Sequence, residues 1–350
     1  MANPLALHRG GYDGAGAQVG HVTRVASMTA PLAIVADIGG TNTRVALADG
    51  AVVRQSSIRR YANADYPSLE PVLQQYLRDM GETAVDRVCV AAAGPVRDGV
   101  AVMTNLDWTI DADLLTRATG AQRTAILNDL QAQGHALGHI APNLLRPLIA
   151  GPIQAKAAML VVGVGTGMNA APVHETPWGR VVAASECGHI SMPVQTAQDF
   201  RLSRFVASHG AHAHGFAGVE DVLAGRGLER VHAFVTSEAG EIQEMKAADI
   251  MTAIGAGDGL ARQTAALYVH LLGAELGNLA LIHLPFGGIY LIGGVARAMT
   301  PYMTEMGLAA AFRDKGRFGA FMASFSIFVV EDDFAALTGC AAYLANGGRG

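Results

Sequence analysis

A carboxylate beside a glycine turn, in the stretch DIGGT at residues 37–41, is the first feature of this chain that could do chemistry. Asp37 ends an apolar run, and Gly39 and Gly40 follow it. Glycines permit a tight turn and let backbone N–H groups approach another molecule, and such turns bind anions. No Gly-Lys-Ser/Thr follows, so this is not a Walker loop. The pattern predicts a phosphate-sized turn with a carboxylate next to it.

Two later glycine turns repeat this arrangement. Residues 157–173 again read as an apolar strand, a glycine turn and a returning strand, and an apolar run at 289–292 ends in two glycines that open a predicted helix. The residues at these turns are Gly165, Thr166, Gly167, Gly293 and Gly294. A helix N-terminus favours anions. Each turn taken singly could be an ordinary hairpin, but together they favour a nucleotide held by two similar halves of the chain.

A second candidate carboxylate, Asp129, ends the apolar stretch RTAILND. A carboxylate at such a position could accept a proton from an attacking hydroxyl. Asn128 and Asp129 could equally cap the helix that follows, because both residue types are favoured at helix N-caps. The residues alone leave both interpretations open.

Composition restricts the class of protein. The 350 residues are 51% hydrophobic and 16% charged, with a formal net charge of −5. This balance is typical of a globular protein with a large core and argues against nucleic acid or an anionic membrane as partner. We expect no membrane span, because the glycines of the sequence interrupt its apolar stretches before they reach about 18 residues. Three scattered cysteines indicate a reducing cytoplasm and no disulfide framework.

The elements that would position these residues alternate between strands and helices, which predicts an α/β fold. A helix is expected over 66–81 and ends at Gly81, and strands are expected over 87–96 and 123–129. A longer helix is expected over 259–284. Residues 1–30 have no apolar periodicity, so we expect a flexible extension there, with Met28 as a plausible natural start of the chain.

From residue 32 onward the chain resembles the bacterial glucokinases of the sugar kinase, actin and heat-shock chaperone superfamily. The resemblance rests on DIGGTNTR at 37–44 followed, in the family's order, by LNDLQAQGHAL, GVGTG, ECGH, GVEDVLAGRGL, FGGIYLIGGVA and AAFRDKGRF. It implies two ribonuclease-H-like lobes with an active-site cleft between them. The small lobe would be residues 31–138, completed by 332–350, and the large lobe residues 139–331. A homodimer is compatible with this fold.

The same resemblance implies phosphorylation of a sugar, glucose first, at its 6-hydroxyl by ATP and Mg²⁺. Asp129 would be the catalytic base, and Asp37 would orient Mg²⁺ through water. The implied sugar ligands are Asn105, Asn128, Glu186, His189 and Glu220. The implied nucleotide site comprises Asp37, Gly39, Gly40, Thr41, Asn42, Gly165, Thr166, Gly167, Gly293 and Gly294.

Some of these assignments have alternatives in the residues themselves. His189 could be a structural histidine, and Glu220 a solvated acid at a helix start. Cys187 stands where the family usually has glycine and could narrow a sugar pocket. Met168 and Asn169 stand where leucine and glycine are usual, and their bulk beside the phosphate turn could weaken ATP binding. Other possible functions are a kinase for another hexose or amino sugar, a non-catalytic sugar sensor, and an ATPase clamp.

Overall fold

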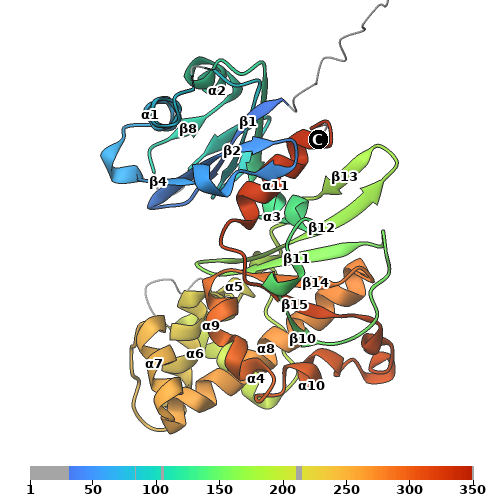
Figure 1. Ribbon diagram of the computed structural model, residues 1–350. Coiled ribbons are helices and arrows are strands. Elements are labelled where there is room, and N and C mark those ends of the chain that lie inside the picture. The colour runs from blue at the N-terminus through green and yellow to red at the C-terminus, as the bar shows by residue number, and fades with distance from the viewer. Residues whose placement is uncertain (1–30, 83, 104–105, 210–214, 349–350) are drawn as a thin grey trace, which may run out of the picture. The chain divides into compact units, whose positions relative to one another are not determined.

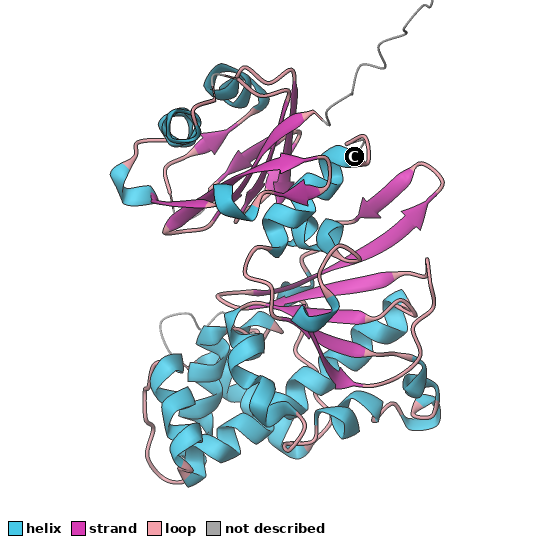
Figure 2. Ribbon diagram, in the orientation of Figure 1, coloured by secondary structure: helices cyan, strands magenta, loops and turns pink. Residues whose placement is uncertain are grey.

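The computed structural model describes residues 31–82, 84–103, 106–209 and 215–348. Within these residues, two large mixed sheets and one small sheet are flanked by helices (Figure 1, Figure 2). The fold is therefore mixed α/β, as the alternation of strands and helices predicts.

The first large sheet has the strand order β3-β2-β1-β5-β9, and β4 also pairs with β2. Its strands are β1 (Leu32–Ile38), β2 (Asn42–Asp49), β3 (Val52–Val53), β4 (Arg59–Ala62), β5 (Arg87–Ala92) and β9 (Arg123–Asn128). The helices that pack on it are α1 (Leu69–Met80), α2 (Ala112–Thr119) and α11 (Ala335–Ala345). The small sheet comprises β6 (Val96–Arg97), β7 (Val100–Val102) and β8 (Thr109–Ile110).

The second large sheet has the order β10-β15-β14-β11-β12-β13. Its strands are β10 (Leu145–Ile149), β11 (Met159–Val164), β12 (Met168–Thr176), β13 (Gly179–Val182), β14 (Ile289–Ile292) and β15 (Ile327–Val330). The remaining α-helices are α3 (Asp129–Ala136), α4 (Ala197–Ser208), α5 (Glu220–Leu223), α6 (Gly225–Glu238), α7 (Ala247–Ala256), α8 (Gly259–His283), α9 (Gly294–Met303) and α10 (Leu308–Arg313). Two short 3₁₀ helices matter below, η2 (Asn63–Asp65) and η4 (Cys187–His189).

The two large sheets repeat one topology. In the first, β1 pairs antiparallel with β2 and parallel with β5, which pairs parallel with β9. In the second, β11 pairs antiparallel with β12 and parallel with β14, which pairs parallel with β15. The repeated strand–turn–strand pattern in the sequence therefore corresponds to the same position in both sheets, and that prediction is confirmed.

Alternate residues of the central strands face different layers, because side chains alternate across a strand. In β1, Ile34 packs in a cluster with α1 and α2, whereas Val35 packs with α11. In β11, Val162 packs in the cluster that contains α8, whereas Val161 packs with α3. Both strands are thus buried on both faces, which explains their unbroken apolar runs.

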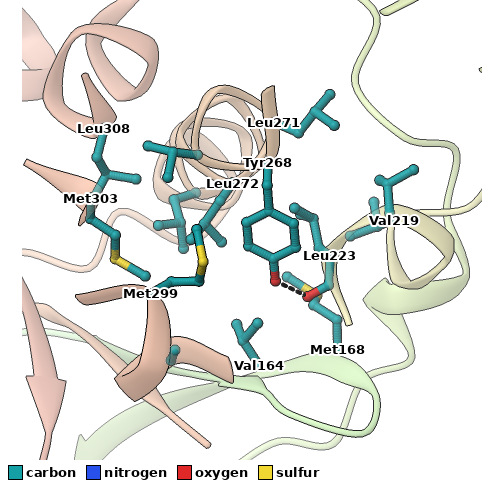
Figure 3. Close-up of a cluster of buried hydrophobic side chains, with 14 of the residues drawn as sticks. Val164, Met168, Val219, Leu223, Tyr268, Leu271, Leu272, Met299, Met303 and Leu308 are labelled. Atoms are coloured by element: carbon teal, nitrogen blue, oxygen red, sulfur yellow. Dashed lines mark hydrogen bonds between the residues drawn. The ribbon is translucent and has the colours of Figure 1, made fainter. Parts of the chain in front are cut away.

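The core beneath the second sheet is formed largely by α8 (Figure 3). Tyr268 is fully buried there, and its hydroxyl donates to the Leu223 carbonyl oxygen at 2.6 Å. Met168 also lies in this cluster and is only 2% exposed. The Met168 side chain therefore packs into the core and adds no bulk beside the phosphate turn.

Helix α8 corrects another expectation from the sequence. We expected no stretch long and apolar enough to cross a membrane, but α8 meets that requirement by length and composition. In the structure, 72% of its most apolar window is buried inside the protein. Its apolar character is therefore explained by its place in the core.

Both expected helices form, although the first begins at Leu69 and not at residue 66. The helix predicted to end at Gly81 is α1, and Gly81 adopts the left-handed conformation (φ 71°) that favours glycine at a helix C-terminus. The long helix predicted from residue 259 is α8. Residues 1–30, for which an extension was expected, lie outside the described residues.

Close packing of α3 against α11 leads to the first prediction. A Cβ atom at Gly339 of α11 would lie 1.7 Å from the Ala132 carbonyl oxygen of α3. Gly339→Ala is therefore expected to push the helices apart and to lower the free energy of unfolding by about 1–3 kcal/mol, the usual cost of overpacking. Urea and thermal denaturation followed by circular dichroism measure this.

Gly255→Ala is the matched control, since Gly255 is also helical but a Cβ there meets only the Tyr302 hydroxyl at 3.4 Å. Because alanine favours helix over glycine, this variant should be as stable as the wild type or more so. Equal stabilities for the two variants would contradict the close packing of α3 and α11.

Candidate active site

The first glycine turn connects β1 to β2 and is held by one buried side chain. The Gly39 N–H donates to the Asn42 carbonyl oxygen at 3.0 Å, which closes the turn. Asn63, in η2, donates through Nδ2 to the Gly39 carbonyl oxygen at 2.8 Å and accepts from the Thr43 hydroxyl at 2.8 Å. Its own N–H donates to the Thr41 carbonyl oxygen. Asn63 thus fixes both sides of the turn.

Asp37 lies at the end of β1, directly before this turn. Burial raises the pKa of its carboxyl, and Arg44 opposes that shift through its charge and a hydrogen bond from Nη1 to Oδ2 at 3.2 Å. The Arg44 side chain is partly exposed. Asp37 is therefore a half-buried carboxylate whose charge is partly balanced by Arg44.

Asn128 and Asp129 lie at the junction of β9 and α3. Asn128 is the N-cap of α3: its Oδ1 accepts from the N–H groups of Leu130 and Gln131, and the Gln131 side chain accepts from the Asn128 N–H. The capping interpretation is therefore correct for Asn128. Its Nδ2 also donates to the Gly94 carbonyl oxygen at 3.2 Å. These bonds fix the backbone that presents Asp129.

The carboxyl of Asp129 has a pKa raised to about 6. Burial is the largest cause, the Leu130 N–H opposes it by donating to Oδ1 at 2.8 Å, and the negative charge of Asp37 raises the pKa further. Strand register explains this proximity. Asp37 pairs with Ala91, and Asn128 pairs with Ala92, so the two carboxylates lie at one edge of the sheet, two strands apart or roughly 10 Å.

A second group of glycines gathers at the end of β11. The turn from Gly165 to Gly167 is closed by a bond from the Gly165 N–H to the Gly167 carbonyl oxygen at 2.9 Å. The Gly225 N–H, at the start of α6, donates to the Gly165 carbonyl oxygen at 2.9 Å. Gly293 has φ 103°, and a Cβ there would lie 2.4 Å from the Val164 carbonyl oxygen. Only glycine fits at Gly293, which brings the start of α9 against this turn.

The candidate sugar ligands on the second sheet lie next to that turn. The Glu220 carboxylate accepts through Oε2 from the Met168 N–H at 3.0 Å, and it is half-buried. It is therefore not the solvated acid that the sequence left open. A Cβ at Gly188 of η4 would lie 2.0 Å from the Met168 carbonyl oxygen, so η4 packs directly on the start of β12.

Glu186 directly precedes η4 and His189 ends it, with 4.0 Å between Glu186 Oε2 and His189 Nε2. Their side chains are 76% and 69% exposed, so both remain accessible to a ligand. Between them, Cys187 is half-buried, and its Sγ lies 3.4 Å from Asn169 Oδ1. Burial raises the pKa of the Cys187 thiol, which therefore stays protonated near neutral pH.

The structure brings the predicted residues into two groups. One lies at the edge of the first sheet and contains Asp37, Gly39, Gly40, Thr41, Asn42, Asn128 and Asp129. The other lies around the ends of β11 and β14 and contains Gly165, Thr166, Gly167, Glu186, His189, Glu220, Gly293 and Gly294. Helix α3, which begins at Asp129, packs on β11. Asn105 lies outside the described residues.

Two residues of the site were missed from the sequence. Gly225 begins the stretch GRGL soon after Glu220, and this glycine pair at a helix start could have indicated it. Asn63 had no such signal, because a single asparagine in a short irregular segment shows its bonds only in the folded chain.

The residues fit a magnesium–nucleotide complex. Among the described residues, no group of three or more His, Cys, Asp or Glu side chains could hold a metal without other ligands. Mg²⁺ needs few protein carboxylates when phosphates and water complete its shell, and Asp37 supplies one beside the first turn. A Cβ at Gly39 or Gly165 would meet only backbone atoms, whereas one at Gly167 would lie 2.6 Å from Oε2 of the Glu220 carboxylate. The turns offer backbone N–H groups as donors. This donor set suits phosphate oxygens.

Comparison with known proteins agrees with this fold. The crystal structure of a glucokinase from an Antarctic psychrotroph superposes with a TM-score of 0.82 at 27% identity, covering 90% of this chain and 99% of that chain. A ROK-family glucokinase from Streptomyces griseus, solved in complex with glucose and AMPPNP, has a TM-score of 0.60 at 20% identity and covers 91% and 100%, which shows the shared fold. The fold is that of the sugar kinases.

The family follows from the sequence matches. A glucokinase from Caulobacter vibrioides is 32% identical over 324 residues, covering 91% of this chain and 96% of that protein. The Glucokinase family model matches residues 34–347. This chain therefore belongs to the glucokinase family and is an enzyme of that family, as the sequence motifs indicated.

The coupling between the two carboxylates gives the second prediction. Asp37→Asn removes a negative charge that opposes ionisation of Asp129, so the pKa of Asp129 should fall below about 6. A carboxyl ¹³C NMR titration, assigned with Asp129→Asn, measures it. Asp49→Asn is the control. Asp49 ends β2, far along the strand from Arg44, the residue opposite Asp37, and it forms an ion pair with Arg54. An unchanged Asp129 pKa in Asp37→Asn would show that the charges are not coupled.

Proposed function

We propose that this protein transfers the γ-phosphoryl group of ATP to the 6-hydroxyl of D-glucose, giving glucose 6-phosphate and ADP. The observation that carries the proposal is the β9–α3 junction, where Asp129 has a pKa of about 6 and lies on the same sheet edge as Asp37 and the first glycine turn. Membership of the glucokinase family and the names of its relatives support glucose as the acceptor.

Asp129 would act as the general base. A carboxylate with a pKa of about 6 is ionised at neutral pH, so it can accept the proton of the sugar hydroxyl as that oxygen attacks phosphorus. The charge would be lost as the pH falls through 6, and activity with it. The capping bonds of Asn128 hold the Asp129 backbone in place, which favours the in-line geometry that phosphoryl transfer requires.

The sugar would be recognised by side chains that pair with its hydroxyl groups. Glu186, His189 and Glu220 present two carboxylates and an imidazole around η4. The carboxylates can accept hydrogen bonds from sugar hydroxyls, and the imidazole can accept or donate one. Asn128, which belongs to the group of residues at the edge of the first sheet, would add an amide. Asn105 remains a proposed ligand on the basis of the family motif alone.

The nucleotide would be held by backbone N–H groups and by one carboxylate. The turns at Gly39–Asn42 and Gly165–Gly167 and the start of α9 at Gly294 would bind phosphate oxygens. Asp37 would hold Mg²⁺ through water. When bound, Mg²⁺ neutralises the negative charge that develops on the phosphates. The AMPPNP and glucose bound to the S. griseus enzyme, which shares the fold, support these two ligand classes.

The division of the chain into lobes is part of the same proposal. Residues 31–138 and 332–350 would form a small lobe, because α11 packs on the first sheet. Residues 139–331 would form a large lobe around the second sheet. We also propose that the enzyme acts in the cytoplasm, where ATP is available and where the thiols of Cys89 and Cys340 stay reduced.

A sugar panel in a coupled ADP-release assay tests the reaction and its acceptor. We expect the highest kcat/KM for glucose among glucose, fructose, mannose and N-acetylglucosamine, with the phosphate on the 6-hydroxyl by ³¹P NMR. A clear preference for another sugar would overturn the glucose assignment and favour the alternative of a hexose or amino-sugar kinase. Sugar binding without ADP release from any of them would favour a non-catalytic sensor.

Replacement of the base gives a sharper test. Asp129→Asn keeps the size and one acceptor oxygen but removes the charge that takes the proton, so kcat should fall by roughly 10²–10⁴ while sugar affinity changes little. Steady-state kinetics and calorimetric sugar binding measure the two effects separately. Because asparagine also tolerates the first turn of a helix, the melting temperature should stay close to that of the wild type. A kcat above about a tenth of the wild-type value would rule out Asp129 as the base.

A further inference from the structure

The Asn169 side chain joins the start of β12 to the segment at residues 185–187. Its Nδ2 donates to the Ser185 carbonyl oxygen and, at 3.3 Å, to Oε2 of the Glu186 carboxylate. Its Oδ1 accepts from the Cys187 N–H at 3.1 Å and from the Ser185 hydroxyl at 3.1 Å. One amide group therefore bonds three consecutive residues of the loop that carries a proposed sugar ligand.

The position of Asn169 on β12 is rigid. Its neighbours Met168 and Ala170 are 2% and 1% exposed, and β12 pairs with β11 through Gly163 opposite Asn169. An amide anchored on a central strand holds its partners more accurately than one on a mobile loop. The Glu186 side chain, in contrast, is 76% exposed and would otherwise sample several rotamers.

The two glutamates proposed as sugar ligands are held in the same way. Glu220 Oε2 accepts from the Met168 N–H, and Glu186 Oε2 accepts from Asn169 Nδ2. Adjacent residues at the start of β12 thus each fix one oxygen of a glutamate. Fixing one oxygen orients the second oxygen toward a ligand and reduces the rotamer entropy lost when the ligand binds.

We propose that Asn169 is a positioning residue for sugar recognition: it orients the Glu186 carboxylate and fixes residues 185–187, so that the sugar meets a preorganised site. The proposal rests on the proposed function of Glu186 as a sugar ligand. The Asn169 amide bonds to Glu186, which precedes η4, and to Cys187, the first residue of η4.

Asn169→Asp tests this with little change in size. The Oδ1 acceptor for Cys187 is retained, but the donor to Glu186 becomes a second carboxylate oxygen, which repels it. We expect the glucose KM, and the calorimetric Kd for glucose without nucleotide, to rise about tenfold or more. The KM for ATP and kcat should stay within about twofold of the wild type. If Asn169→Asp fails to fold, Asn169→Gly replaces it in the test. This variant lacks all these side-chain bonds but adds no charge, and it should also weaken glucose binding.

A double-mutant cycle separates positioning from general damage. If Asn169 acts through Glu186, then Asn169→Asp should weaken glucose binding at least fivefold less in a Glu186→Gln background than in the wild type. Asn278→Asp is the matched control, because Asn278 Nδ2 also donates to a glutamate oxygen, Glu275 Oε2 at 3.2 Å, in the core. It should lower the melting temperature but leave the glucose Kd unchanged.

Three outcomes would overturn the proposal: a glucose Kd within twofold of the wild type in Asn169→Asp, equal losses in both backgrounds, or an equal loss in Asn278→Asp. Failure of the proposed function is distinguishable from these. A wild-type protein that binds glucose but phosphorylates no sugar would refute the kinase reaction, while the calorimetric comparison would still decide the role of Asn169.

Discussion

The position of Asp129 depends on the close approach of helices α3 and α11, which only glycine allows. Gly339 of α11 lies where any side chain would overlap the Ala132 carbonyl oxygen of α3. On another side of α3, a Cβ at Gly134 would lie 2.6 Å from Cγ1 of Val182 on β13. Helix α3 is therefore confined between α11 and the β12–β13 hairpin. Any displacement of its axis would also displace the carboxylate at its first residue.

This confinement links the two sheets. Leu337 and Cys340 of α11 pack on the first sheet, and Leu130 and Ala136 of α3 pack on the second. Because the two helices also touch, a continuous packed path runs from β1 through α11 and α3 to β11. Protein interiors are dense and resist compression, so such a path transmits small shifts. The C-terminal helix is thus as important for the position of Asp129 as β9, the strand that precedes this residue.

Local patterns account for what could be predicted from the sequence. Strand–turn–strand units, the end of α1 at Gly81 and the helix opened by Gly293 each depend on residues close together in the chain, so their periodicity and glycines were sufficient. The expectation that no stretch is apolar enough to cross a membrane was wrong for α8, because an apolar helix in a core and one in a membrane have similar compositions. In the site, glycine positions and the β9–α3 junction were predictable. The bonds of Asn63 and Asn169 join segments that only the fold brings together.

The electrostatics of the first sheet edge explain how one carboxylate could serve as a base at neutral pH. A fully solvated aspartate has a pKa near 4 and is a weak base, whereas one with a pKa close to 7 combines a large ionised fraction with greater basicity. Burial at the β9–α3 junction and the charge of Asp37 raise the pKa of Asp129 to about 6, and the Leu130 N–H limits the rise. A cation held by Asp37 would cancel part of its negative charge and lower the pKa of Asp129. At neutral pH such a cation would therefore favour the ionised form of Asp129, which is the form that can accept a proton.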